Sequence, residues 1–175
     1  MKKKIMIAFI IVFLSVIFIS VLMLIRFLVR YEKYLDEIMK PSVQYEKLHK
    51  QYPKLTRHIF DIIDDERHGV PPETICAIID AESGFDVHAE SKSGDYGLMQ
   101  INKCHRLKNS FDPRTNIRFG VKHFRYCLIR SRGNNELALM MYNSGCNRKE
   151  YHNQKYAMRI LGKIDKSHGI MLATL

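Results

Sequence analysis

In the stretch AIIDAESGFDVHAESKSGDYGLMQIN, residues 77–102, an apolar helical pattern ends and a glycine-rich segment begins. The apolar run opens at Pro71 and Pro72, residues that suit the first turn of a helix. The helix is expected to end near Glu82, just before a glycine. Residues 84–111, which contain three glycines, are then expected to form loops with at most short strands.

The segments on both sides of this stretch carry helical signals. Apolar residues at helical spacing predict a helix over about 56–67. Asp112 followed by Pro113 is a strong helix start, since Asp caps the first turn and proline fits its first position. Two further helices are expected over 135–142 and 149–164. The body is therefore predicted to be mainly α, with one irregular segment in the middle.

The N-terminus differs in kind from the rest of the chain. Residues 5–25 contain no charged residue, and at about 1.5 Å per residue a helix of this length spans roughly 30 Å, the thickness of the bilayer's hydrocarbon core. The run is longer than the core of a cleaved signal peptide. We therefore expect a cytoplasmic tip and transmembrane anchor over 1–30, a juxtamembrane stalk interrupted at Pro41 over 31–54, and one domain over 55–175.

Charge and ligand-type residues narrow the classes of partner. The formal net charge of +10 suits an anionic polymer or a membrane surface. No stripe of interleaved basic and aromatic residues marks a nucleic-acid site, so nucleic acid is not an expected partner. The eight histidines show no metal-ligand spacing, and neither a metal nor another cofactor is predicted.

The four cysteines all lie in the body, and an even number in an exported domain permits two disulfides with three pairings. Cys104 and Cys146 lie in loops, so theirs is the pairing to test first. Cys76 lies in the apolar helical run, so it is either a disulfide partner or a small core residue. No pairing is assigned to Cys127.

Glu82 is the leading candidate for chemistry. It follows the apolar run at the end of its helix, so its carboxyl is expected to leave the helix at the edge of the core. Partial burial there would raise its pKa and make it a proton donor near neutral pH. The alternative from position alone is an ordinary surface glutamate at a helix end.

Two stretches place Glu82 in a larger pattern. Residues 82–100, ESGFDVHAESKSGDYGLMQ, and residues 139–145, LMMYNSG, together resemble the Glu-Ser, Gly-Leu-Met-Gln and Ala-Tyr-Asn motifs of lytic transglycosylases with a lysozyme-like fold. The Asp-Pro-x-x-Asn-Ile-x-x-Gly pattern at 112–120 is also similar. The resemblance covers about residues 70–160. Met141 departs from it, where the family usually has alanine.

The resemblance implies a reaction and a fold. The fold would be a lysozyme-like single domain of the goose-type-lysozyme kind, and the reaction cleavage of the β-1,4 bond between N-acetylmuramic acid and N-acetylglucosamine in peptidoglycan. Glu82 would protonate the glycosidic oxygen and then accept the proton of the muramoyl C6 hydroxyl, leaving 1,6-anhydro ends. One carboxyl can act as acid and then as base without a cofactor.

The resemblance also implies roles for the neighbours of the acid. Ser83 would orient it, Met99 and Gln100 would line the sugar groove, and Tyr142 would hydrogen-bond near the reacting centre. Asn143 would contribute to the same substrate-binding region, mainly by holding its turn. For Met99 and Tyr142 the residues alone leave ordinary core packing open.

Asp95 is the point where the motif is ambiguous. The segment Gly94 to Asn102 is also similar to the Asp-Tyr-Gly-x-x-Gln-Ile-Asn segment of animal-type lysozymes, whose Asp is the second catalytic carboxylate. A separation of about 5 Å from Glu82 would permit retaining hydrolysis. The alternative is an Asp that accepts backbone N–H bonds and shapes the turn.

Together these features predict a single-pass protein of the inner membrane with its catalytic domain in the periplasm. The expected partners are peptidoglycan strands, the inner membrane through residues 5–25, and a secretion, conjugation or pilus apparatus that needs local wall opening. Two alternatives stay open: a lysozyme-type hydrolase using Glu82 with Asp95, and a non-catalytic wall-binding assembly factor.

Overall fold

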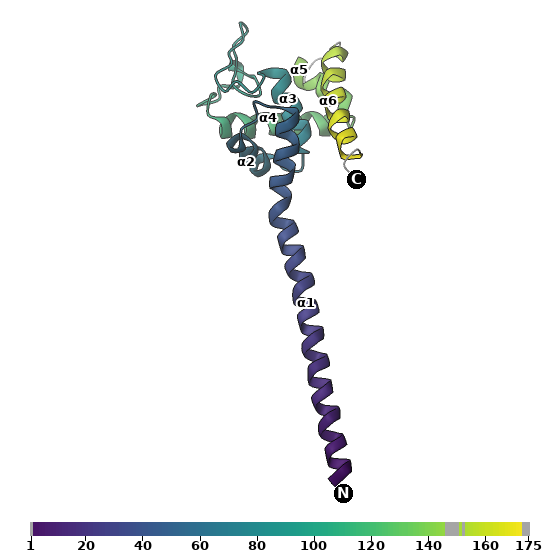
Figure 1. The fold of residues 1–175 in the computed structure, drawn as a ribbon. Coiled ribbons are helices and arrows are strands. Elements are labelled where there is room, and N and C mark those ends of the chain that lie inside the picture. Colours follow the sequence, from purple (N-terminus) through teal and green to yellow (C-terminus); the bar gives the residue numbers. More distant parts are fainter. Residues whose placement is uncertain (1, 146–150, 152, 173–175) are drawn as a thin grey trace. The chain divides into compact units, whose positions relative to one another are not determined.

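The computed structural model describes residues 2–145, 151 and 153–172, and the chain divides into two compact units, Met1–Gln44 and Tyr45–Leu175. Helix α1, Lys2–Gln51, runs from the first unit into the second (Figure 1). The other helices and both strands belong to the second unit.

The first unit consists of α1 alone. Phe13–Leu35 is long and apolar enough to cross a membrane, with a mean hydropathy of 2.3, and its side chains are exposed. This segment overlaps the predicted anchor over 5–25. The predicted interruption at Pro41 is wrong, because the helix continues through it. A proline inside a helix removes one hydrogen bond and favours a kink, but it does not oblige the helix to end.

In the part of the second unit that the structure describes, five further α-helices follow α1. These are α2 (Arg57–Glu66), α3 (Pro72–Glu82), α4 (Pro113–Arg130), α5 (Asn135–Ser144) and α6 (Gln154–Leu172). Three of them begin at side-chain caps, in which Thr56, Asp112 and Asn134 each accept a backbone N–H bond from the first turn. The predicted start of the last helix at residue 149 lies outside the described residues.

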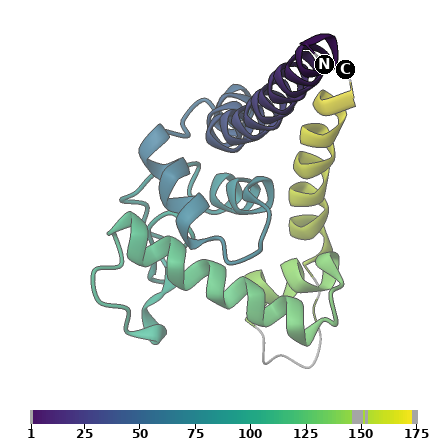
Figure 2. The ribbon, with the colours of Figure 1, turned by 90° about the horizontal axis from the view of Figure 1, so that it is seen from below.

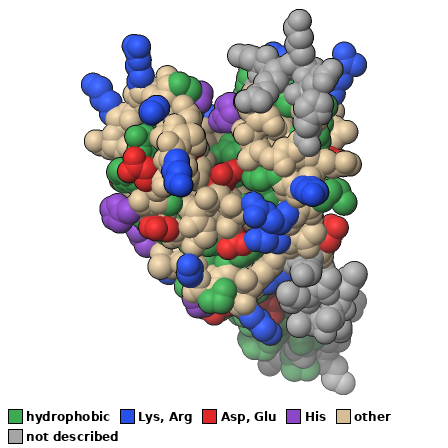
Figure 3. All heavy atoms as spheres, turned by 90° about the horizontal axis from the view of Figure 1, so that it is seen from above, with side chains coloured by type: hydrophobic (Ala, Val, Ile, Leu, Met, Phe, Trp, Pro, Cys, Tyr) green, Lys and Arg blue, Asp and Glu red, His purple; other side chains and the backbone are tan. Residues whose placement is uncertain are grey.

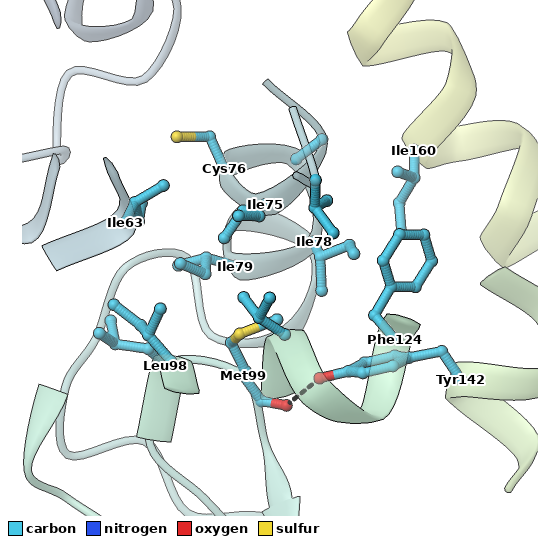
Figure 4. Packing of buried hydrophobic residues seen from close by; sticks show 14 of the residues in the cluster. Ile63, Ile75, Cys76, Ile78, Ile79, Leu98, Met99, Phe124, Tyr142 and Ile160 are labelled. Atoms are coloured by element: carbon cyan, nitrogen blue, oxygen red, sulfur yellow. Dashed lines mark hydrogen bonds between the residues drawn. The ribbon is translucent and has the colours of Figure 1, made fainter. Parts of the chain in front are cut away.

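Helix α3 is the centre of this unit, with α2, α4 and α6 arranged around it (Figure 2). Five successive residues, Ile75 to Ile79, are fully buried, so the helix is apolar on nearly all sides. Figure 4 shows its side chains packed among Ile63, Leu98 and Phe124. The core therefore fixes α3, and with it the position of its last residue, Glu82.

The irregular segment after α3 contains two short antiparallel strands, β1 (Asp95–Tyr96) and β2 (Ile101–Asn102), followed by a 3-10 turn, η1 (Lys103–His105). Between the strands the chain reverses at Gly97, whose φ is +73°. A side chain there would collide with Asn116 of α4, so glycine is required both by backbone angle and by space.

Asn116 fastens this segment to α4. It is fully buried, accepts the Met99 N–H at 2.7 Å, and donates to the carbonyls of Tyr96 and Ser110, both at 2.8 Å. The Met99 side chain packs where Gly120 leaves space on the same helix. Two residues of the Asp-Pro-x-x-Asn-Ile-x-x-Gly pattern, Asn116 and Gly120, therefore hold the strand segment against α4.

A buried carboxylate joins α2 to α4. Glu66 accepts hydrogen bonds from Arg118 at 2.7 and 2.9 Å and from Arg114 at 3.0 Å. Its side chain is 7% exposed. The Arg118 hydrogen bond, reinforced by Arg114, outweighs burial and lowers the pKa of Glu66 to about 2.

Candidate active site

A cleft of about 910 Å³ opens on the second unit. Its lining comes from the end of α3, the segment from Ser91 to His105, helix α4 and the end of α5. Figure 3 shows this face, with acidic side chains and histidines beside the hollow. An open cleft of this size at the meeting point of several elements is a suitable place for a polymer to bind.

Glu82 lies in this cleft as the last residue of α3 and is half-buried. Burial raises its pKa, and the negative charge of Asp95 adds to the rise. A hydrogen bond from Tyr156 and the positive charge of Arg159 act in the opposite direction without cancelling it. The carboxyl is thus biased towards the protonated form, as the sequence predicted.

Tyr156 is the nearest partner of this carboxyl and was missed in the sequence. Its hydroxyl donates to Oε1 of Glu82 at 2.5 Å, from a side chain on α6 that is 6% exposed. Burial, followed by the negative charge of Glu82, raises the pKa of Tyr156, so the phenol stays protonated. The signal that was available is its place on the apolar face of α6, four residues before Ile160.

The Ser83 hydroxyl is bonded to two backbone carbonyls. It lies 2.8 Å from the Leu98 carbonyl and 3.1 Å from the Ile79 carbonyl, and it donates to these backbone oxygens. The bond to Leu98 ties the end of α3 to the irregular segment. That Ser83 orients Glu82 stays a prediction.

Asp95 lines the same cleft, with both carboxylate oxygens engaged. One oxygen accepts from the hydroxyls of Ser91 at 2.5 Å and Ser93 at 2.6 Å, and the other accepts from the Asn102 amide at 2.6 Å. Burial raises the pKa of Asp95, but these hydrogen bonds and the charge of Lys103 outweigh it and lower the pKa overall. These hydrogen bonds favour the ionised form of Asp95 and connect the two sides of the strand turn.

Met99 has its side chain in the core, the alternative that its sequence position left open. Its side chain is buried against Gly120 in the core, and the cleft lining that the structure describes does not include it. Its backbone has a different part, because its carbonyl accepts a hydrogen bond from the Tyr142 hydroxyl at 2.9 Å (Figure 4). Tyr142 lines the cleft and is largely buried.

Gln100 and Asn143 both line the cleft. The Gln100 amide donates to the carbonyls of Gly97 at 3.0 Å and Ala89 at 3.2 Å, in a backbone conformation with φ of +48°. Asn143 accepts a hydrogen bond from Asn153, which links the end of α5 to the residue just before α6. Both amides therefore stabilise the edges of the cleft.

The described residues contain no group of three or more His, Cys, Asp or Glu side chains that could hold a metal ion. Cys76 is a buried free thiol and Cys104 an exposed one, while Cys127 is a buried cysteine. Cys146 lies outside the described residues.

The second unit is therefore a mainly helical domain of lysozyme-like type. It has a half-buried glutamate at the end of its central helix. Two solved structures resemble it. One is the 70 kDa soluble lytic transglycosylase from Escherichia coli (TM-score 0.54, 20% identity, 63% of this chain and 24% of that chain). The other is an inactive Glu-to-Gln mutant of lytic transglycosylase Slt from Pseudomonas aeruginosa (TM-score 0.55, 20% identity, 72% and 26%).

The family itself follows from a direct match. The model of the transglycosylase SLT domain matches residues 62–161, more than half of the chain, and the chain belongs to this family. It spans about a quarter of the length of the two solved proteins.

Proposed function

We propose that this protein is a peptidoglycan lytic transglycosylase that uses Glu82 as its single acid and base. The observation that supports this most is the half-buried carboxyl in an open cleft, with its pKa raised and a tyrosine hydroxyl bonded to it. A similar protein is described as inactive after a Glu-to-Gln change, which agrees with an essential glutamate in this family.

The reaction begins with proton transfer from Glu82 to the glycosidic oxygen between muramic acid and glucosamine. The bond from C1 of the muramoyl residue to that oxygen breaks, and positive charge develops at C1. The C6 hydroxyl of the same sugar then forms a bond to C1 and gives its proton to the Glu82 carboxylate. The acid is regenerated, one C–O bond replaces another, and no water is consumed.

Tyr156 has a defined part in this cycle. After the first proton transfer Glu82 becomes a carboxylate in a half-buried place, which burial disfavours. The Tyr156 hydroxyl donates to Oε1 and offsets part of that cost. Its high pKa keeps it a donor throughout.

A hydrolytic reaction is the second candidate, because Asp95 lies in the same cleft and its charge contributes to the raised pKa of Glu82. Against it, the Asp95 oxygens are bonded to Ser91, Ser93 and Asn102. We therefore assign Asp95 to holding the turn and to electrostatic support of the protonated acid.

Two isosteric variants separate these functions. Glu82→Gln is expected to lower peptidoglycan cleavage by at least about 10³-fold. The variant should still co-sediment with insoluble peptidoglycan as the wild-type protein does. Asp95→Asn is expected to keep the anhydro product at a reduced rate. Wild-type cleavage by Glu82→Gln would remove this residue from the mechanism. Unchanged biological complementation by Glu82→Gln would favour a non-catalytic assembly factor.

We further propose that α1 anchors the protein in the inner membrane and places the second unit in the periplasm, where the wall lies. The apolar segment Phe13–Leu35 supports the anchor. The N-terminal lysines favour a cytoplasmic tip against Arg26, Arg30 and Lys33 on the other side, and a substrate in the wall favours an exported second unit. Because such an anchor would confine cleavage to the wall near the membrane, we propose that the protein opens the wall locally for a secretion or conjugation apparatus. Protease added to spheroplasts should digest the second unit and leave the anchor. Protection of the second unit would reverse the orientation.

A further inference from the structure

Helix α4 and the turn after it concentrate positive charge. Residues 113–135 contain six lysine and arginine residues and no acidic residue. Helix α4 lies at the outside of the second unit, where it packs against α2 and α5 (Figure 2). None of the six cations belongs to the cleft lining that the structure describes, so the proposed reaction does not explain their clustering.

Three of these cations share one side of α4 with an exposed isoleucine. Arg118, Lys122, Arg125 and Ile129 follow one another at intervals of four, three and four residues, the spacing that places side chains on one face of a helix. All four are exposed. Ile129 is 75% exposed, more than any other large hydrophobic side chain in the described part of the chain. We call these four residues the basic face.

The basic face is neutralised at one end only. Arg118 bonds to Glu66 of α2 at 2.7 and 2.9 Å. Lys122 and Arg125 have no ion pair or side-chain hydrogen bond with any residue that the structure describes. The uncompensated positive charge therefore lies in the C-terminal half of α4, beside Ile129.

The combination of cations with an apolar side chain favours one kind of anionic partner. Lysine and arginine attract the phosphates of an anionic bilayer, and an apolar residue beside them reaches the boundary of the acyl chains. Carboxylates of the wall polymer would pair with the cations but would give Ile129 no apolar contact. The chain also carries an apolar segment long enough to cross a bilayer, Phe13–Leu35, and its insertion would keep a lipid surface within reach of the second unit.

We propose that the basic face docks the second unit on the anionic phospholipid surface of the membrane that holds α1. Lys122 and Arg125 contact lipid phosphates, and Ile129 enters the boundary between head groups and acyl chains. This inference rests on the proposed function for the membrane anchor. It gives the domain a reversible attachment to the bilayer in addition to its covalent one through α1.

The covalent attachment makes a weak contact sufficient. A domain tethered to a bilayer meets the lipid surface at a high effective concentration, so docking needs little intrinsic affinity. Each cation near an anionic surface favours docking about 5-fold. Tyr126, which follows Arg125 on α4, lines the cleft, so docking would also fix the direction of the cleft relative to the membrane.

The test uses the absence of tryptophan from the sequence. Ile129→Trp gives the full-length protein a single indole on the basic face, and the protein is reconstituted into vesicles of phosphatidylcholine with or without phosphatidylglycerol. A dansyl-labelled lipid in the vesicles accepts energy from the indole. With phosphatidylglycerol we expect emission at shorter wavelength and stronger energy transfer, and with phosphatidylcholine alone the emission of an exposed indole. High salt should reverse the change.

Two double variants in this background test the contribution of charge. Lys122→Gln with Arg125→Gln should lower the ratio of docked to undocked protein about 25-fold. The matched control, Lys92→Gln with Lys108→Gln, removes two exposed cations from the irregular segment and should retain the response to phosphatidylglycerol. A control for the position of the indole is Met158→Trp on the exposed side of α6, whose emission should be the same in both kinds of vesicle.

Three results would overturn the docking face. These are equal emission of Ile129→Trp in both kinds of vesicle, an equal loss of response in both glutamine pairs, and a response that survives Lys122→Gln with Arg125→Gln. If the lipid response is absent and the same glutamine pair weakens co-sedimentation with peptidoglycan, the face belongs to the wall polymer instead. Thermal unfolding of each variant separates misfolding from loss of contact.

The proposed function fails independently of this face. Release of the wild-type protein from the vesicles by alkaline carbonate would reject the membrane anchor. Absence of anhydro products from the wild-type protein would reject the transglycosylase reaction, whatever the indole emission shows.

Discussion

The Tyr156 hydroxyl donates a hydrogen bond of 2.5 Å to Oε1 of Glu82, joining residues 74 positions apart in the sequence. This bond connects the end of the central helix α3 to α6, the last helix of the domain. It means that the acid is positioned by tertiary packing as well as by its own helix. The first prediction follows from removing it.

Tyr156→Phe removes the donor and leaves the ring in the core. Since the hydrogen bond lowers the pKa of Glu82, that pKa should rise further in the variant. The first step needs the protonated acid, so the loss of activity at high pH should move to higher pH. The turnover should also fall about 10- to 100-fold, because the carboxylate loses its partner. The pH–rate profile measures both effects.

The control for this change is Tyr96→Phe. The Tyr96 ring contacts Phe111, and the residue lies outside the described cleft lining. It should leave the profile in place. A Tyr156→Phe protein with the wild-type rate and an unshifted profile would show that the hydrogen bond has no part in the reaction.

Arg159 supplies the second prediction. Its guanidinium lies 5.9 Å from the centre of the Tyr156 ring and donates to the Ala81 carbonyl at 3.2 Å. Its charge lowers the pKa of Glu82. Arg159→Gln should therefore raise that pKa and move the loss of activity to higher pH, whereas Arg159→Lys should keep it near the wild-type position. A profile that shifts equally in both variants would reject a role for the charge.

Asn116 allows a prediction about stability. Asn116→Ala leaves the Met99 N–H and the carbonyls of Tyr96 and Ser110 without their partner in a buried place. The free energy of unfolding should fall by roughly 3 kcal/mol, and cleavage should fall with it at temperatures where the variant is partly unfolded. Denaturant titration measures the change. Asn135→Ala, on the exposed first turn of α5, is the control and should cost well under half as much.

The lowered pKa of Glu66 predicts how the free energy of unfolding depends on pH. Its pKa is about 2 in the folded protein against 4.5 ordinarily, so its stabilising effect is complete above pH 4.5 and is lost as the pH falls towards 2. Glu66→Gln should cost about 2 kcal/mol at pH 7 and little at pH 2.5. Thermal unfolding across this range tests it. Asp61→Asn, in the exposed pair with Arg57, should have a small effect throughout.

Local signals predicted the elements well. Asp112 and Pro113 start α4 at the expected place, and the apolar run before Glu82 is the central helix. Each depends on neighbours a few residues away, where the chemistry of caps and periodicity acts. The break expected at Pro41 is absent, because a proline inside a helix removes one hydrogen bond without obliging the helix to end.

The site depended on packing that no local pattern contains. Met99, in the turn between the strands, points into the core because Gly120 of α4 leaves room for it. Tyr156 contacts Glu82 although it lies 74 positions further along the sequence. His105 and His123 become neighbours only once η1 lies against α4. The place of Glu82 at the end of its helix was predictable, and the groups that contact its carboxyl were not.

The most direct test of the central claim is digestion of peptidoglycan in water labelled with heavy oxygen, followed by mass spectrometry of the new muramic acid ends. A single acid and base at Glu82 predicts 1,6-anhydro ends that carry no label, because the C6 hydroxyl attacks C1 and water takes no part. Reducing ends with the label at C1 would contradict this account and make the protein a hydrolase.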